Sequence, residues 1–163
     1  MKMSRIKACL LASLALAAVL PATVALGEEA LIWTEKSDGD SVSLAYGSLD
    51  AAKNPVFLLS CFNDMDVVVL NIFSVIEGKR PGQALTIELS AGSETLSVAG
   101  ESSIDRKTSS MFAESGEVPP DPILTVLRSP GPLTVKLGFT TKTLSDAGRE
   151  AAVTQFAKDC TLD

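Results

Sequence analysis

The chain has 163 residues, of which 46% are hydrophobic, and it carries a formal net charge of −6 with no histidine. This length suits one domain, and the hydrophobic fraction excludes a disordered chain. The negative charge argues against a nucleic-acid partner, and the missing histidine excludes Ser-His-Asp and Cys-His catalysis and His-ligated zinc.

Residues 1–27 have the pattern of a secretory signal peptide. A basic start precedes an uncharged apolar run over residues 8–20, and small residues then lead up to Gly27 and Glu28, between which we predict cleavage. An uncleaved anchor is the first alternative, but the run is shorter than the roughly 20 residues of a membrane span. A lipoprotein is the second, but Cys9 stands at the start of the run and not at its end.

Removal of this leader changes the charge balance of the chain. Residues 28–163 keep 11 basic and 20 acidic side chains, a net charge of −9. Such a charge favours basic partners and disfavours anionic membrane surfaces. We therefore expect a single periplasmic or secreted domain over residues 28–163, with no stable membrane insertion.

Two cysteines, Cys61 and Cys160, remain after the leader is removed. In an exported protein they most simply form one disulfide bond, which here closes a loop of about 100 residues. Two free buried thiols are the alternative. A redox role would more naturally use a C-x-x-C pair, which the sequence lacks.

Most of the remaining chain has the pattern of β-strands. Apolar and polar residues alternate, as in half-buried antiparallel strands, over residues 42–46, 85–89, 95–98 and 133–139. Two further runs, Val56–Leu59 and Val67–Leu70, are apolar on both faces, which predicts central strands covered on both sides. Asn63 and Asp64 between them favour a tight turn, so the two strands are expected to pair as a hairpin.

Short turn sequences separate the predicted strands. The turns are predicted at Asp38–Asp40, Lys79–Gly82 and Ala91–Ser93, with Lys79 and Arg80 at a hairpin tip. Strands with such short links favour a mainly β (α+β) domain, an antiparallel β-sandwich or barrel.

A short helix is predicted near residues 122–129, because Asp121 can cap it and Pro122 suits its first position. The segment Glu114–Pro122 before it is rich in Pro, Gly and Glu, which predicts a mobile loop open to proteolysis.

A second helix is predicted near residues 146–159, capped by Ser145 or Asp146. Phe156 and Cys160 are four residues apart and therefore point together into the core. A disulfide to Cys61 would fasten this helix to the sheet.

The sequence lacks the motifs of common active sites, including G-x-S-x-G, the P-loop and G-x-G-x-x-G. Asp38 and Asp40 could ligate calcium, but the spaced acids and distal Glu of an EF-hand do not follow, so a solvated turn is favoured. The small cluster of Asn63, Asp64 and Asp66 is likewise interpreted as a hairpin turn. We expect no catalytic residues, no metal and no cofactor.

Trp33 and Tyr46 are the single Trp and the single Tyr of the chain. Rare large aromatic residues can anchor an interface, so both are weak candidates for a binding site of otherwise unknown position. In a small domain they more often fill the core, which is the favoured interpretation.

The layout of these residues resembles small bacterial periplasmic β-domain proteins. It combines Trp33 soon after the leader, an apolar strand ending at Leu59–Cys61, a strand at Leu133–Phe139 and a small-residue helix ending in Cys160. The nearest groups are the type VI secretion-associated proteins of the VasI/TagO kind and the invasion-associated locus B kind. The resemblance implies a non-catalytic envelope protein that binds or recruits a protein or another envelope component.

Two other functions compete with this one. The negative charge would suit an inhibitor of a basic secreted hydrolase such as lysozyme. A hydrolase built on paired carboxylates is the third reading, because such pairs meet in space and not in sequence.

The leader gives the first testable prediction. N-terminal sequencing of the exported protein is expected to start at Glu28, because the small residues before it suit the signal peptidase. A chain that starts at Met1 would contradict cleavage.

Overall fold

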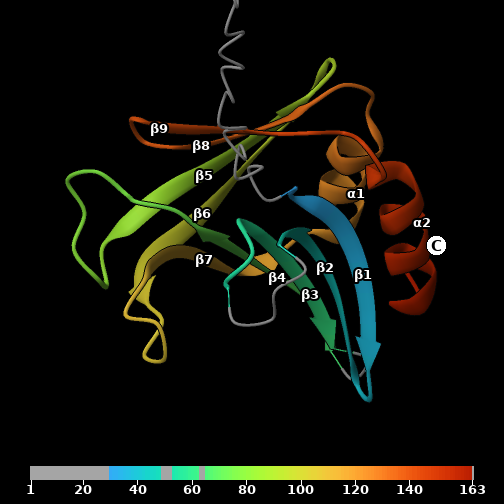
Figure 1. Cartoon of the computed structure of the whole chain (residues 1–163), viewed down its shortest axis with the longest axis horizontal. Helices are drawn as coiled ribbons and strands as arrows, with labels where there is room; N and C mark the ends of the chain where they lie inside the picture. The colour runs from blue at the N-terminus through green and yellow to red at the C-terminus, as the bar shows by residue number, and fades with distance from the viewer. Residues whose placement is uncertain (1–29, 49–52, 63–64, 163) are drawn as a thin grey trace, which may run out of the picture.

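The computed structural model describes residues 30–48, 53–62 and 65–162. The predicted signal peptide, its predicted cleavage position and the predicted turn at Asn63 and Asp64 lie outside these ranges. The described chain forms one nine-stranded antiparallel sheet and two helices (Figure 1). The elements are β1 (Ile32–Asp38), β2 (Ser41–Gly47), β3 (Phe57–Phe62), β4 (Met65–Phe73), β5 (Ala84–Ala91), β6 (Glu94–Ile104), β7 (Met111–Val118), α1 (Pro120–Arg128), β8 (Leu133–Leu137), β9 (Thr140–Leu144) and α2 (Arg149–Asp159).

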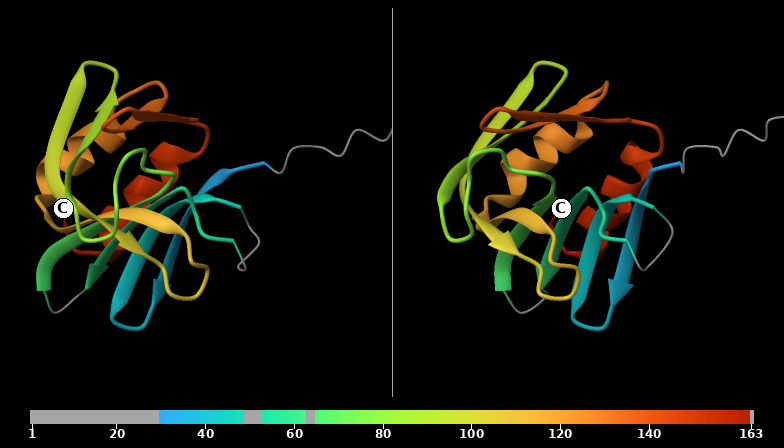
Figure 2. Two further views of the ribbon diagram at one scale, coloured as in Figure 1. Left: turned by 90° about the vertical axis from the view of Figure 1, so that its left-hand side faces the viewer. Right: turned by 60° about the vertical axis from the view of Figure 1, so that its left-hand side comes forward.

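The sheet curls into a half-barrel, and both helices lie on its concave side (Figure 2). Helix α2 packs against β1 and β2, α1 packs against β5 and β6, and the two helices also contact each other. Their buried faces and the inward side chains of the strands form one hydrophobic core. The predicted mainly β fold with two helices is therefore confirmed. Neither described helix has the length and apolar character of a membrane span.

The strand order departs from a simple meander at two points, the pairings of β4 with β7 and of β5 with β8. The order is β1-β2-β3-β4-β7-β6-β5-β8-β9, so β4 pairs with β7 and not with β5. Lys79 and Arg80 consequently lie in the link from β4 to β5, two strands that are not neighbours in the sheet. The prediction that they lie at a hairpin tip is therefore wrong. Buried Ser102 holds this connection, because its hydroxyl donates to the carbonyls of Arg80 (2.5 Å) and Gln83 (3.2 Å).

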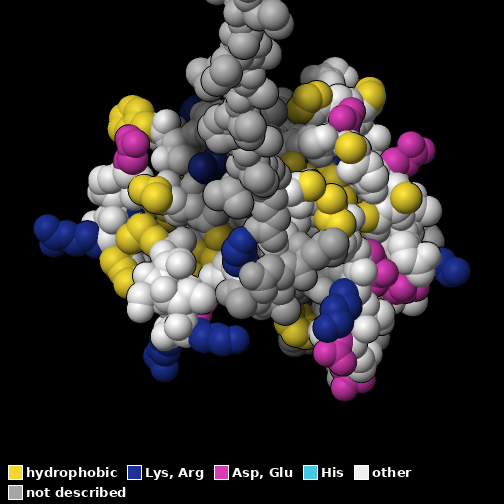
Figure 3. All heavy atoms as spheres, in the orientation of Figure 1, with side chains coloured by type: hydrophobic (Ala, Val, Ile, Leu, Met, Phe, Trp, Pro, Cys, Tyr) yellow, Lys and Arg dark blue, Asp and Glu magenta, His cyan; other side chains and the backbone are white. Residues whose placement is uncertain are grey.

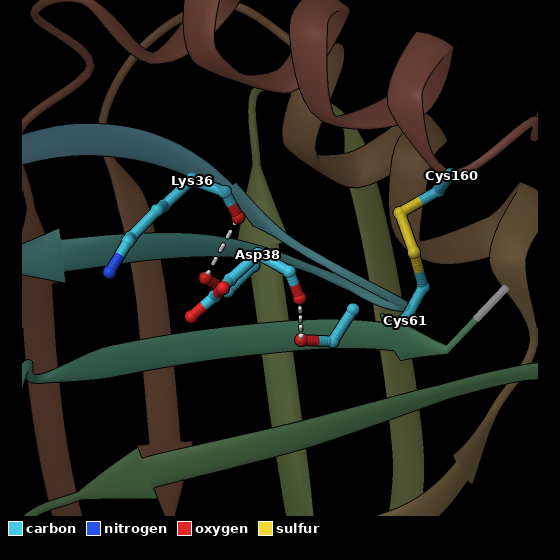
Figure 4. The surroundings of a disulfide bond; sticks show 6 residues. Lys36, Asp38, Cys61 and Cys160 are labelled. Atoms are coloured by element: carbon cyan, nitrogen blue, oxygen red, sulfur yellow. Dashed lines mark hydrogen bonds between the residues drawn. A yellow bond between two sulfur atoms is a disulfide. The ribbon is translucent and has the colours of Figure 1, made fainter.

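The disulfide between Cys61 and Cys160 is present, as predicted. It joins β3 to the C-terminal end of α2 across a Cα–Cα distance of 6.2 Å (Figure 4). Phe156, one turn earlier in α2, is fully buried. The last helix is therefore held to the sheet both by a covalent bond and by apolar packing.

Both helices differ from the prediction at their N-terminal ends. Helix α1 begins at Pro120, so Asp121 lies in its first turn and does not cap it. Helix α2 begins at Arg149 after Gly148, whose φ of 79° turns the chain, and neither helix has a side-chain cap. Ser145 instead accepts a hydrogen bond from the amide of Ala147.

The segment Glu114–Pro122 is not a loop. Its first half belongs to β7, which pairs with β4, and its last residues begin α1. Pairing with a neighbouring strand outweighs the local turn preference of Gly and Pro, and a bulge opposite Val69 accommodates the extra residue.

The strand predicted over residues 133–139 ends at Leu137. Gly138 has a φ of 60° and turns the chain into β9, which leaves Phe139 93% exposed at the turn and not in the core. The two strands apolar on both faces are buried only on the inner face. Outward Leu58 and Val69 are half-buried, because the helices cover the concave side alone.

Removing the disulfide tests its role in holding α2. The double variant Cys61→Ser/Cys160→Ala is expected to lose about 4–5 kcal/mol of unfolding free energy, on the chain-entropy model for a loop of this size. Urea denaturation measures this loss, and hydrogen exchange is expected to accelerate first in α2. Reduced wild-type protein is the control. Unchanged protection of α2 in the variant would contradict this role.

Candidate functional site

Trp33 and Tyr46 lie in the core, 6% and 7% exposed, as their favoured interpretation predicted. They face each other across β1 and β2 with ring centroids 5.1 Å apart. The indole N–H of Trp33 donates to the carbonyl of Ser145 (2.5 Å), and the Tyr46 hydroxyl accepts from the amide of Ser145 (3.4 Å). The pair therefore fastens the segment after β9 to β1 and β2, and little of its surface is left for a partner.

The acidic segment Asp38–Asp40 is the turn of the β1–β2 hairpin, as predicted, and its residues are exposed. Acidic side chains gather at this hairpin tip at the bottom of the view in Figure 3. Within the described ranges no three His, Cys, Asp or Glu residues come close enough to hold a metal ion.

Arg149 is a buried cation that sequence reasoning did not single out. Its Nη2 donates to the carbonyls of Ser129 and Gly131 in the link between α1 and β8, the latter at 2.8 Å. Burial lowers the pKa of Arg149, and the charge of Asp146 opposes this shift. These two hydrogen bonds to backbone carbonyls tie the start of α2 to the α1–β8 link.

Glu35 and Asp159 form a candidate carboxylate pair between β1 and the end of α2. Burial raises the pKa of Glu35, and the charge of Asp159 adds to this effect. Neither residue lines any of the hollows described below.

A hollow of about 590 Å³ lies beside the ends of β4 and β7. Phe73, exposed Val75 and Met111 give it apolar walls, and Asn54 and Thr108 give it a polar side. Phe73 also stacks on its cross-strand neighbour Phe112, with centroids 5.1 Å apart.

The turn between β6 and β7 is ordered by the carboxylate of Asp105. This group accepts hydrogen bonds from the Thr108 hydroxyl (2.7 Å), the Asn54 amide (2.9 Å) and the backbone N–H of Lys107 (2.9 Å). These bonds favour the charged form and lower the pKa of Asp105 to about 2. The turn thus holds β6 and β7 together at this end of the hairpin.

At its other end the same hairpin opens. Strands β6 and β7 pair only from Ile104↔Met111 to Glu101↔Glu114. Beyond that point β6 stays with β5 while β7 stays with β4, and the two strands separate (Figure 1). Two adjoining hollows of about 360 and 630 Å³ lie between residues 96–101 of β6 and residues 114–119, which begin at the last pair. We name this space the β6–β7 groove.

Backbone groups of β6 face the β6–β7 groove. Ser102 exchanges hydrogen bonds with Gly82 and Gln83, on the side of β5. Successive residues of a strand point their N–H and C=O groups to opposite sides. The groups of Ser97 and Ala99 therefore point away from β5 and into the groove, where the described part of β7 no longer pairs with them.

Glycine permits the close approach at the end of the groove. A Cβ on Gly100 would lie 2.5 Å from the carbonyl oxygen of Glu114 and 3.3 Å from Ile87 Cδ1, too close for any other residue without a shift. On the opposite side, the bulge in β7 at residues 116 and 117 bends this strand and increases its twist. Both features lie at the point where the strands separate.

Three carboxylates border the β6–β7 groove, those of Glu101, Glu114 and Glu117. The register places Glu101 directly opposite Glu114. Asn71 follows in the same row on β4, and its Oδ1 has no hydrogen-bond partner among the described residues. The groove therefore combines two strand edges that pair with no other described strand and a negatively charged border.

Sequence reasoning missed this groove. Leu96 and Val98 alternate with polar residues as any half-buried strand does, and nothing local shows which edge lacks a neighbour. The local signal for it is glycine within a strand, at Gly100 and Gly116, because such a glycine often marks a close approach or a bulge, but Gly47 in β2 carries the same signal.

In comparisons with known proteins, no family model, no curated protein and no solved structure matches this chain.

The Asp105 turn gives a prediction about pH. Because the pKa of Asp105 is lowered on folding, its contribution to the turn is present above pH 4 and is lost as the pH falls through about 2. Carboxyl NMR titration is expected to give a midpoint near 2 in the wild-type protein. Asn54→Ala and Thr108→Ala each remove a hydrogen-bond donor to Asp105, and each is expected to raise this midpoint toward the ordinary pKa of an aspartate. An unchanged midpoint in both variants would contradict this assignment.

Proposed function

We propose that this protein is an exported, non-catalytic binding module of the bacterial cell envelope, which captures an extended segment of a protein partner in the β6–β7 groove. The observation that carries the proposal is the pair of strand edges that separate after Glu101↔Glu114. An edge with free N–H and C=O groups is a template for an added strand, because the backbone hydrogen bonds do not depend on partner sequence.

Export to the periplasm is part of this proposal. It is supported by the leader over residues 1–27 and by the Cys61–Cys160 bond, since disulfides persist in oxidising compartments. The resemblance to periplasmic β-domain proteins of the VasI/TagO and locus B kinds supports the same location and a recruiting role.

The groove offers two kinds of contact to an added strand. Ser97 and Ala99 supply backbone groups from β6, and the side chains of Leu96 and Val98 supply apolar surface at the inner side. Strand addition uses these together, with backbone bonds for affinity and alternate side-chain positions for selectivity.

Inhibition of a basic secreted hydrolase is the second candidate, favoured by the acidic border of the groove and the predicted net charge of −9. Lysozyme activity with added protein tests it, and an unchanged rate would exclude that target.

The opposed pair Glu101 and Glu114 is the best support for a carboxylate hydrolase. If the protein hydrolyses a glycoside, and if Glu101→Gln and Glu114→Gln each abolish this turnover, the hydrolase hypothesis would replace the binding proposal.

Proline substitution at the edge tests strand addition. Ala99→Pro removes an N–H that faces the groove, while the bonds of β6 to β5 come from the alternate residues Val98 and Gly100. A library of extended eight-residue peptides is expected to yield binders that slow amide exchange at Ser97 and Ala99. Ala99→Pro is expected to abolish their binding.

Ala99→Ser is the matched control, because it alters the side chain and keeps the N–H. It is expected to bind within about twofold of wild type, as exposed substitutions usually cost less than about 0.5 kcal/mol. Equal binding by Ala99→Pro, or a library without binders, would overturn the proposal.

A further inference from the structure

The β6–β7 groove also indicates what its occupant looks like. We infer that the added segment is basic and alternates Lys or Arg with apolar residues. This inference rests on the proposed function, because it assigns the chemistry of the partner for the same groove.

The opposed carboxylates at the closed end of the groove are the first observation. Glu101 and Glu114 are direct cross-strand partners, and like charges in that position destabilise a sheet. Elsewhere in the described sheet no two like charges are direct cross-strand partners. Glu88 lies opposite Lys136, whose Nζ is 3.1 Å from the carboxylate. No ion pair to Glu101 or Glu114 is formed within residues 30–48, 53–62 and 65–162. A cation from outside would remove the repulsion.

The remaining border of the groove is also negatively charged. Glu117 is exposed on β7 at the wider end, and no Lys or Arg is among the described residues that line either hollow. A segment lying between the strands would therefore meet Glu101 and Glu114 at the closed end of the groove and Glu117 on the β7 side farther along. Charge complementarity of this kind selects basic partners and speeds their encounter.

The two faces of the groove explain the alternation. In β6 the even-numbered side chains, such as Val98, point toward the core, and the odd-numbered ones, such as Glu101, point outward. Glu114 also lies on the outward face, since it is the cross-strand partner of Glu101. Side chains of an added strand alternate in the same way, so its outward residues meet carboxylates and its inward residues meet Leu96 and Val98.

Three synthetic peptides separate charge from strand addition. The probe is a fluorescently labelled eight-residue peptide that alternates lysine and valine, and its two comparisons carry glutamine or glutamate in place of lysine. Fluorescence anisotropy with the purified protein is expected to show binding in the order lysine, glutamine, glutamate. Raising the salt concentration is expected to weaken the lysine peptide most.

Two charge variants test the assigned carboxylates. Glu101→Gln/Glu114→Gln is expected to weaken binding of the lysine peptide about tenfold and leave the glutamine peptide nearly unchanged. Glu77→Gln/Glu150→Gln removes the same net charge from exposed residues outside the groove and is expected to stay within about twofold.

The outcomes distinguish this inference from the proposed function. Equal binding of the lysine and glutamine peptides, both lost in Ala99→Pro, would overturn the basic segment and keep strand addition. An equal loss in both charge variants would show general attraction and overturn the site. Absence of binding by all three peptides would overturn this inference, and the peptide library would still decide the proposed function.

Discussion

Two helices packed inside the curve of one sheet hold its two halves apart. Helix α2 lies on β1 and β2, α1 lies on β5 and β6, and contact between the helices joins the halves. Strand β6 must follow β5 over α1, while β7 must follow β4. Paired strands cannot take both courses, so β6 and β7 separate after four residue pairs. The groove is therefore a consequence of how the core is filled.

The open side of the half-barrel is closed by a few long-range contacts. The disulfide fastens the end of α2 to β3, and the Ser145 backbone bonds to Trp33 and Tyr46. Arg149 binds carbonyls of the link between α1 and β8. Each contact joins the last part of the chain to a distant element, so the position of α2, and with it the spacing of the two sheet halves, depends on the C-terminal segment.

The β6–β7 groove departs from the rules that the rest of the sheet follows. Elsewhere the register of the described strands opposes no two like charges and sets Glu88 against Lys136, whereas here it opposes two glutamates beside backbone groups that no described strand pairs with. Such local conflicts cost stability, and in natural proteins they concentrate at functional sites. The extended cationic segment that we propose as the occupant would relieve the conflict, because it would supply both the missing backbone partners and the opposite charge.

Alternation along the strands, the turn at Asp38–Asp40, the approximate positions of the two helices and the Cys61–Cys160 bond were predictable from the sequence by itself. These features depend on side-chain period, local turn chemistry and the number of cysteines, all of which are local or countable. The pairing of β4 with β7, the strand in place of a loop at Glu114–Val118, exposed Phe139 and the groove were decided only by the tertiary structure. The physical reason is that an antiparallel strand carries the same alternation whichever neighbour it has, so its free edge is determined by the helices that the sheet wraps around.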